Sequence, residues 1–209
     1  MWRQQIMTWN DAQKWESGWW GNCINTIGEE LKQFAYAEKM GLTIFHDQKS
    51  PFNINASRMN ICDIGGGPAS MLLKTSNRGD NCVVIDPILD NVPGWVKERY
   101  NTANIKTSCV QGENLLSIHC NQEFQEVWIY NVLQHTQNPE LIIKNAKQIS
   151  KIIRIFEWID TPINKGHPHS LNERKMNNWL GGIGKAEYIN KNTAVGKAYY
   201  GVFPVSEVK

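Results

Sequence analysis

Two short apolar runs, each ending in an acidic residue, constrain the fold of this 209-residue chain more than any other feature. Residues 60–70 read Asn-Ile-Cys-Asp-Ile-Gly-Gly-Gly-Pro-Ala-Ser, and residues 83–87 read Val-Val-Ile-Asp-Pro. This order is typical of adjacent parallel strands whose carboxyl ends receive a nucleoside ligand. Asp86 lies roughly 20 residues beyond the turn, where a carboxylate can accept hydrogen bonds from ribose hydroxyls.

The spacing within the glycine-rich turn separates two classes of cofactor. A dinucleotide fingerprint, G-x-G-x-x-G, needs glycine at position 70, where this chain has Ser70. The pattern present is Asp63-x-Gly65-x-Gly67-x-Ala69. A carboxylate at position 63 would repel a pyrophosphate, but it would suit the cationic amino-acid end of S-adenosylmethionine. The spacing therefore favours S-adenosylmethionine over a nicotinamide dinucleotide.

This pattern resembles motif I of the class I S-adenosylmethionine-dependent methyltransferases, and residues 83–87 resemble the second motif of that family. Ala69 stands where the family has its third glycine. The resemblance covers about residues 58 to 205. It implies a Rossmann-like α/β fold, a doubly wound seven-stranded and mostly parallel sheet with its last strand reversed. Residues 1–57 match the variable cap of the family.

The composition sets limits on the function. With 41% hydrophobic and 20% charged residues, the chain has the composition of one soluble globular domain. A net charge of +2 without a long basic run gives no electrostatic footprint for nucleic acid. No apolar run approaches the ~18 residues of a membrane span. The five cysteines form no C-x-x-C pair and the N-terminus has no signal-peptide core, so we expect a cytoplasmic protein.

The first 57 residues are predicted to form a helical cap and a linker. Residues 10–41 are largely helical by pattern, with Gly41 as a C-cap and residues 46–57 as a polar linker. The predicted inward face of the helix holds Ile27, Leu31, Phe34 and Ala35. Five of the nine tryptophans lie in the first twenty residues. They either pack on the sheet domain or form walls of a substrate pocket, with Trp19, Trp20 and Tyr36 as candidate contacts.

From residue 58 to 209, strand and helix patterns alternate, which predicts a parallel sheet with crossover helices. The predicted strands are residues 59–64, 82–86, 105–111, 126–132 and 151–158. The predicted helices are residues 69–75, 94–100, 139–150 and 171–180. Residues 186–189 and 198–205 are predicted to pair as an antiparallel hairpin.

The resemblance implies a set of cofactor contacts at the carboxyl ends of the strands. These residues are Asp63, Gly65, Gly67, Asp86, Gln111, Gly112, Glu113 and Asn131. The first three would face the methionine moiety and Asp86 the ribose. Residues 111–113 close the third strand, where the family places a polar side chain near the adenine amine. A turn at Asp86-Pro87 and a loop at residues 111–113 without a ligand are the structural alternatives.

A histidine follows the fourth predicted strand, in the sequence Asn131-Val-Leu-Gln-His-Thr136. Members of the resembled family that methylate small molecules often carry a histidine here, and His135 matches it. An ordinary imidazole pKa of about 6.5 suits a general base that removes a proton from a substrate hydroxyl. The alternative is a histidine that hydrogen-bonds the backbone of its loop.

The loop after the fifth strand holds Asp160, His167 and His169 among glycine and proline residues. These side chains could supply a base, contact a substrate hydroxyl, ligate a metal, or serve only the loop structure. Three candidate ligands without an H-E-x-x-H or paired-acid pattern predict no metal site. We therefore expect the two histidines to be candidate catalytic residues, and Asp160 a candidate substrate contact.

These observations predict an enzyme that transfers the methyl group of S-adenosylmethionine to a small-molecule or glycan hydroxyl. The Asn/Asp-Pro-Pro-Tyr/Phe sequence of amino-group nucleic-acid methyltransferases is absent after Asn131, which favours oxygen as the acceptor atom. The abundant aromatics and small net charge favour a neutral acceptor such as a sugar. A nicotinamide-dependent oxidoreductase, a nucleic-acid methyltransferase and a non-catalytic cofactor-binding protein remain as alternatives. The sequence leaves the oligomeric state open.

Overall fold

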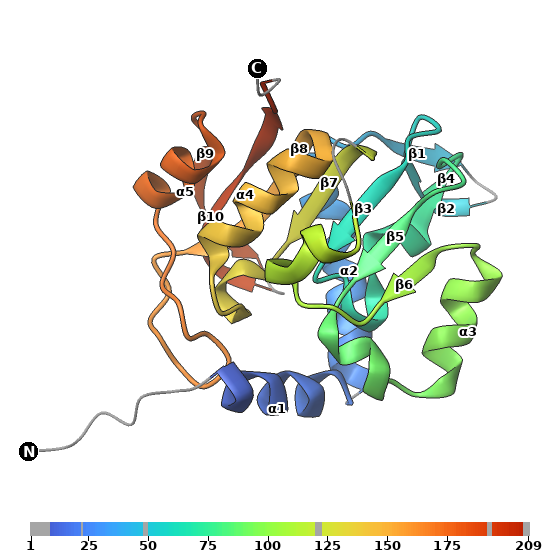
Figure 1. Ribbon diagram of the computed structural model, residues 1–209, viewed down its shortest axis with the longest axis horizontal. Helices are drawn as coiled ribbons and strands as arrows, with labels where there is room; N and C mark the ends of the chain where they lie inside the picture. The colour runs from blue at the N-terminus through green and yellow to red at the C-terminus, as the bar shows by residue number, and fades with distance from the viewer. Residues whose placement is uncertain (1–8, 22, 48–49, 120–122, 192–193, 207–209) are drawn as a thin grey trace, which may run out of the picture.

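A seven-stranded sheet forms the centre of the computed structural model, which describes residues 9–21, 23–47, 50–119, 123–191 and 194–206 (Figure 1). In spatial order its strands are β6 (Lys106–Ser108), β5 (Val83–Ile85), β3 (Ile61–Ile64), β7 (Phe124–Tyr130), β8 (Ser150–Ile159), β10 (Ala194–Pro204) and β9 (Lys185–Lys191). Neighbours from β6 to β8 are parallel, whereas β10 is antiparallel to both β8 and β9. The predicted sheet with a reversed last strand is confirmed.

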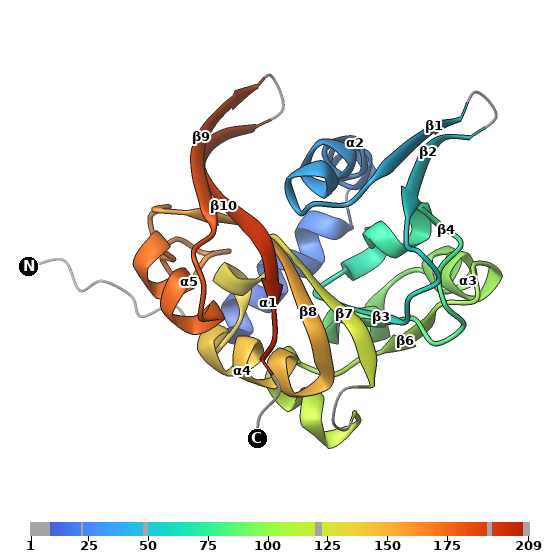
Figure 2. The same cartoon turned by 90° about the horizontal axis from the view of Figure 1, so that it is seen from above.

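Helices cover both faces of this sheet and one of its edges. They are α1 (Trp9–Trp20), α2 (Cys23–Lys39), α3 (Gly94–Thr102), α4 (Pro139–Ile149) and α5 (Glu173–Leu180). Helices α2 and α3 pack on one face, and α4 and α5 pack on the other (Figure 2). Helix α1 lies across the carboxyl ends of the parallel strands (Figure 1). Among the described helices, none has the length and apolar character needed to cross a bilayer.

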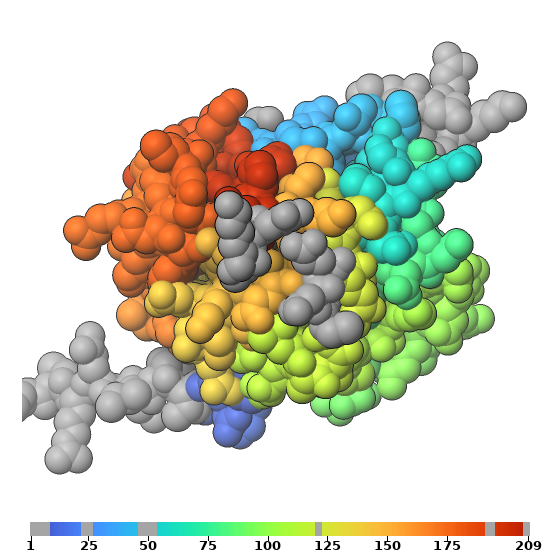
Figure 3. Space-filling view, turned by 45° about the horizontal axis from the view of Figure 1, so that its top comes forward, coloured from blue at the N-terminus to red at the C-terminus, as the bar shows by residue number. Residues whose placement is uncertain are grey.

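Short 3-10 helices follow several strands at this same edge. They are η1 (Gly67–Ala69), η2 (Met71–Lys74), η3 (Pro87–Asn91), η4 (Gly112–Ser117) and η5 (Leu133–His135). Helix α1 contacts both η3 and η5. Helix α1 therefore closes against the turns that leave the strands, and the space-filling view shows part of its dark blue surface beside yellow surface at the lower edge of the molecule (Figure 3).

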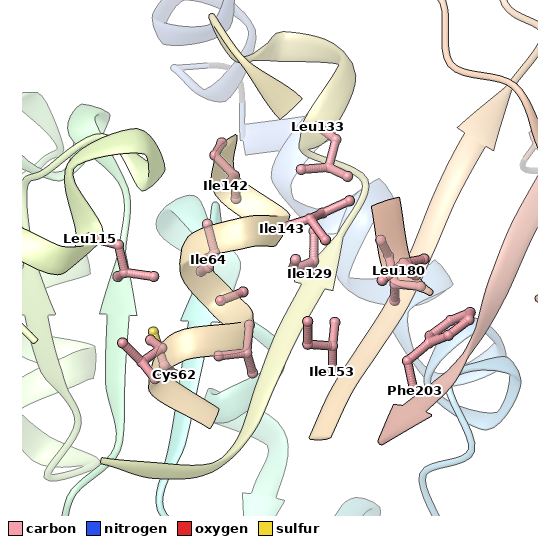
Figure 4. Close-up of a cluster of buried hydrophobic side chains, with 14 of the residues drawn as sticks. Cys62, Ile64, Leu115, Ile129, Leu133, Ile142, Ile143, Ile153, Leu180 and Phe203 are labelled. Carbon is pink, nitrogen blue, oxygen red and sulfur yellow. The ribbon is translucent and has the colours of Figure 1, made fainter. Parts of the chain in front are cut away.

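Helix α4 shows how the sequence builds the core. Its apolar residues recur every three or four positions, so that one face of the helix meets the sheet. On this face Ile142 and Ile143 pack with Ile129 and Ile153 of the strands (Figure 4). Each fully buried side chain of this size contributes about 1.5–3 kcal/mol of transfer free energy. The Asn138 side chain caps the helix start by accepting the Leu141 N–H at 3.1 Å.

A buried ion pair between two strands of the sheet also holds the end of α2. Arg154 of β8 donates two parallel hydrogen bonds to Glu126 of β7, each 2.8 Å long. The Trp128 indole N–H donates to the same carboxylate at 2.7 Å. The third guanidinium nitrogen donates to the Met40 and Gly41 carbonyls, where Gly41 at φ +72° ends the helix as predicted.

Two segments differ from the sequence-based prediction. Residues 69–75, predicted as an α-helix, form only η1 and η2, because the Ser70 hydroxyl caps a second turn by accepting the Leu72 N–H. The polar segment 46–57, predicted as a linker, contains most of a hairpin of β1 (Ile44–Asp47) and β2 (Ser50–Asn55). Strand β2 pairs in turn with β4 (Thr75–Ser76) in a second, three-stranded sheet within the described residues. The division into a cap at 1–57 and a core at 58–209 stays a prediction.

The predicted inward face of α2 is confirmed for Phe34 and Ala35, which pack on the core, but it was wrong for Ile27 and Leu31. Ile27 and Leu31 are 59% and 66% exposed, whereas Glu29 and Gln33 are only 6% and 2% exposed. The polar face turns inward because it lines a cavity, described below, in which these side chains have hydrogen-bond partners. Amphipathic periodicity locates the inner face of a helix only where that face meets an apolar core.

Removing one partner of the ion pair should destabilise the fold. In Glu126→Ala, Arg154 keeps a poorly hydrated charge and Trp128 loses its acceptor, so we expect the free energy of unfolding to fall by roughly 3–5 kcal/mol. Urea unfolding followed by tryptophan fluorescence measures this change. Glu98→Ala, which removes an exposed carboxylate on α3, should stay within about 0.5 kcal/mol of the wild type. Equal effects of the two substitutions would contradict the role of the buried pair.

Candidate active site

A cavity of about 310 Å³ lies at the carboxyl ends of the parallel strands, under α1 and beside α2. Pockets that hold small ligands usually span roughly 300–1,000 Å³. Among the residues predicted as site residues, those lining the cavity are Trp19, Trp20, Gly65, Asp86, Gln111, Gly112, Glu113, Asn131, His135 and His167. They come from six separate segments of the chain, and the fold brings them together.

The glycine-rich turn after β3 requires glycine at its first position. Gly65 has φ +74°, a conformation that side chains rarely adopt. A Cβ at this position would lie 2.1 Å from Cγ2 of Val132, which follows β7. The Gly65 N–H donates to the Ile85 carbonyl at 2.7 Å. The turn therefore packs directly against the segments that follow both neighbouring strands.

Asp86, at the end of β5, is both a structural anchor and a cavity residue. One carboxylate oxygen accepts the Gly67 N–H at 2.9 Å, and the other accepts the Ile88 N–H at 3.0 Å. Burial raises the pKa of Asp86 to about 7, although these two N–H groups lower it. A carboxylate offers about four lone-pair positions, so each oxygen keeps acceptor capacity for a hydroxyl in the cavity.

Two of the predicted contacts to the methionine moiety lie beneath the turn instead of in the cavity wall. The Asp63 carboxylate is buried and accepts the Ser70 hydroxyl proton. Burial raises the pKa of Asp63 to about 7. Gly67 bonds to Asp86 through its N–H and accepts the Tyr100 hydroxyl proton through its carbonyl. Asp63 and Gly67 thus support the turn and do not line the cavity, and their contacts to the methionine moiety stay a prediction.

Two further carboxylates hold backbone N–H groups at this edge. Glu113 lines the cavity and accepts the N–H groups of residues 137 and 138 at 2.8 and 2.9 Å, before α4. Glu157 of β8 accepts the N–H groups of Val132 and Leu133, both at 2.9 Å. The second Glu157 oxygen is buried with no hydrogen-bond partner in the described chain. Burial raises the pKa of Glu157 to about 7.

His135 is buried between the cap and the loop after β8. Its Nδ1 lies 2.8 Å from Oε1 of Glu16 in α1 and 2.7 Å from the Gly166 carbonyl oxygen. Both neighbours are acceptors, so Nδ1 carries the proton and Nε2 is the nitrogen that can act as a base. Burial lowers the pKa of His135, but the carboxylates of Glu16 and Glu157 and the Gly166 carbonyl together more than offset this effect, so that the net pKa is raised.

The loop histidines separate into one cavity residue and one loop residue. The ring of His167 lies 4.6 Å from that of His135, and burial lowers the pKa of His167 to about 4. His169 does not line the cavity, and its Nε2 lies 3.0 Å from the Gln137 carbonyl oxygen. The structure therefore gives His169 a loop contact and no catalytic position. No group of three or more potential metal ligands occurs among the described residues.

Two predicted substrate contacts also lie outside the cavity. Tyr36 is buried in the core and stacks on Phe156 with ring centroids 4.2 Å apart. Asp160 accepts a hydrogen bond from Lys197 at 3.0 Å on the exposed side of the loop. Trp19 and Trp20 do line the cavity, and their rings meet edge to face at 4.7 Å. Of the predicted aromatic contacts, the cavity therefore includes Trp19 and Trp20, and it is also lined by Trp9 and Trp15 of the same helix and by Trp158 of β8.

Sequence reasoning missed the polar side chains that the cap contributes. Glu16 of α1 and Glu29, Lys32 and Gln33 of α2 line the cavity. The Glu29 carboxylate accepts the Tyr130 hydroxyl proton and lies 3.3 Å from the Lys32 ammonium. Glu29 and Gln33 are four residues apart, so a polar stripe at helical spacing was the available signal. No local pattern distinguishes Glu16 from a surface residue.

Comparisons with known proteins identify the fold. No protein-family model and no curated protein sequence matches the chain. Among solved structures, it is similar to the YcgJ protein from Bacillus subtilis, with 9% identity, 69% of this chain and 90% of that chain covered, and a TM-score of 0.54.

Two similar structures contain S-adenosylhomocysteine. The 1,6-didemethyltoxoflavin-N1-methyltransferase of Burkholderia thailandensis matches at 9% identity, with 71% of this chain and 72% of that chain covered and a TM-score of 0.53. The N-methyltransferase NodS of Bradyrhizobium japonicum matches at 13% identity, with 71% and 78% covered and a TM-score of 0.52. The chain therefore has the fold of the class I S-adenosylmethionine-dependent methyltransferases, as predicted.

The buried Glu157 should make stability depend on pH. A carboxyl whose pKa is raised from about 4.5 to about 7 on folding contributes stability below about pH 4.5 that is lost as pH rises through 7. In the wild type, the free energy of unfolding should therefore fall between about pH 5 and about pH 8. We expect this fall to be smaller in Glu157→Gln, which keeps an acceptor oxygen but cannot ionise. The reduction should be on the order of 1–3 kcal/mol by urea unfolding.

A matched control removes a carboxylate that stays in solvent. Glu140→Gln on the exposed side of α4 should leave the pH dependence as it is in the wild type. An identical fall in Glu157→Gln and in the wild type would mean that Glu157 titrates normally in the folded chain.

Proposed function

We propose that this chain is an S-adenosylmethionine-dependent methyltransferase that acts on a small acceptor, with the hydroxyl group of a sugar or glycan as the methylated group. One observation carries the proposal. The ends of β3, β5, β6 and β7 deliver a glycine turn, a buried carboxylate, a polar loop and an asparagine to a single cavity. Ligands bind at this edge of open α/β sheets, where the order of strands reverses.

The lining fits S-adenosylmethionine better than a dinucleotide. The Asp86 carboxylate would accept ribose hydroxyls, and residues 111–113 would lie at the adenine. Gly65 and Asn131 would bracket the methionine end. Carboxylates of Glu16, Glu29, Asp86 and Glu113 outnumber the one ammonium of Lys32 among the lining side chains described, which disfavours a pyrophosphate. When bound, S-adenosylmethionine supplies a methyl group on a cationic sulfur, which keeps the electron pair of the broken bond.

The remaining lining supports the choice of acceptor. Trp19, Trp158 and the hydrogen-bonded pair of Tyr130 and Glu29 line the same cavity. Aromatic planes pack on sugar rings, while carboxylates accept hydroxyl protons. His135 would take the proton from the reacting hydroxyl, and alignment and exclusion of water would supply much of the remaining rate enhancement.

Calorimetry with S-adenosylmethionine and NAD in parallel tests the cofactor. We expect S-adenosylmethionine alone to bind, and Asp86→Ala to weaken it roughly 10- to 100-fold, because charge-assisted hydrogen bonds to the ribose are lost. Asp90→Ala removes an exposed carboxylate from η3, the 3-10 helix that Asp86 caps, and should leave binding unchanged. Asp86→Asn keeps one acceptor oxygen, and it serves as the second variant for the binding measurement if Asp86→Ala does not fold. Binding of NAD alone would overturn the proposal.

Methyl-labelled S-adenosylmethionine tests the acceptor. We offer a panel of methyl glycosides as neutral hydroxyl acceptors and benzylamine as an amine acceptor. Label should enter a glycoside, and His135→Asn should reduce that rate by at least roughly 100-fold, the contribution expected of a general base. Transfer to benzylamine alone would replace oxygen by nitrogen as the acceptor atom. Cofactor binding without any transfer would favour a non-catalytic cofactor-binding protein.

A further inference from the structure

Helix α1 brings a carboxylate into the cavity from outside the sheet domain. The helix lies across the strand ends and contacts η5, which contains His135 (Figure 1). Glu16 extends from it to Nδ1 of His135, and the side chains of both residues are largely buried. An ion pair shielded from solvent in this way retains much more of its interaction energy than an exposed pair.

The contacts of Nδ1 decide which histidine nitrogen is available for chemistry. Nδ1 faces two acceptors, Glu16 Oε1 and the Gly166 carbonyl oxygen, and must donate its proton to them. In the neutral ring, Nε2 then holds the lone pair. The Gly166 carbonyl supplies one of these contacts without any charge, whereas Glu16 also stabilises the imidazolium that forms when Nε2 takes a proton.

We propose that Glu16 is a positioning residue for His135, so that the cap helix completes the general base of the site. This inference rests on the proposed function. The acceptor hydroxyl gives its proton to Nε2 as its oxygen bonds to the methyl carbon, and the electron pair of the broken carbon–sulfur bond stays on sulfur. The positive charge then on the ring of His135 is balanced by the Glu16 carboxylate.

Other charged groups also face His135, and their geometry differs from that of Glu16. The ring of His167 lies beside that of His135, with centroids 4.6 Å apart. A positive charge on His135 lowers the pKa of His167, so the two rings disfavour being charged together. Glu157 of β8 lies behind the turn and is committed to two backbone N–H groups. Asp86 interacts with His135 electrostatically at longer range. Of these charged groups, Glu16 is the one that contacts the ring directly, at 2.8 Å from Nδ1, and it belongs to α1, outside the sheet.

Proton NMR titration of the histidine rings tests this role without any substrate. The signal of His135 is assigned by its loss in His135→Asn. In Glu16→Gln, which keeps the shape and an acceptor oxygen, the His135 midpoint should fall by roughly one to three pH units. Glu38→Gln makes the same change on the exposed side of α2 and should leave the midpoint unchanged. Nitrogen shifts should show the Nδ1–H tautomer retained in Glu16→Gln.

The outcomes separate this inference from the proposed function. A His135 midpoint in Glu16→Gln within about 0.3 units of the wild type would overturn the positioning role, whatever the activity. A lowered midpoint in a chain that binds no S-adenosylmethionine would overturn the proposed function and leave the Glu16–His135 pair intact. Where a glycoside accepts label, the acid limb of its rate profile should shift with the NMR midpoint, and a fixed limb would contradict the proposal.

Discussion

Carboxylates that each hold two backbone N–H groups are the constraint on which the site depends. Parallel strands leave the sheet at one edge, and beyond that edge their backbone groups lose the partners that the ladder supplied. Asp86, Glu113 and Glu157 replace those partners, each with two bonds of 2.8–3.0 Å. A carboxyl group suits this role because its two oxygens can accept two N–H groups at once.

This arrangement fixes the turns relative to one another as well as to their own strands. Asp86, at the end of β5, holds the glycine turn that follows β3, and Glu157 of β8 holds the turn after β7. The turn after β7 in turn packs against Gly65, where no side chain would fit. The cavity wall is therefore built before any ligand binds. Such preorganisation lowers the entropic cost of ordering the site on binding.

The sequence predicted what depends on local pattern and missed what depends on packing. The alternation of strands and helices, the terminal hairpin and the role of Asp86 as a cavity residue could be predicted because their signals lie within short segments, whereas the reversed last strand was implied by the family resemblance. Asp63 was predicted to face the methionine moiety, whereas its buried carboxylate accepts the Ser70 hydroxyl proton beneath the turn. Glu157 is a single acid in an apolar strand, a signal that could have been recognised as a buried anchor.

The cap shows why long-range contacts escape sequence reasoning. Ile27 and Leu31 have the periodicity of a buried stripe, yet they face solvent, because Glu29 and Gln33 of the same helix find partners in the cavity and on the η1 backbone. Glu16 meets His135 across more than half the chain, and no spacing rule connects them. A helix over a functional cavity turns inward the side chains that its ligand and its polar neighbours satisfy. In the part of α2 that holds Glu29 and Gln33, the polar stripe is therefore a better guide to the site than the apolar periodicity.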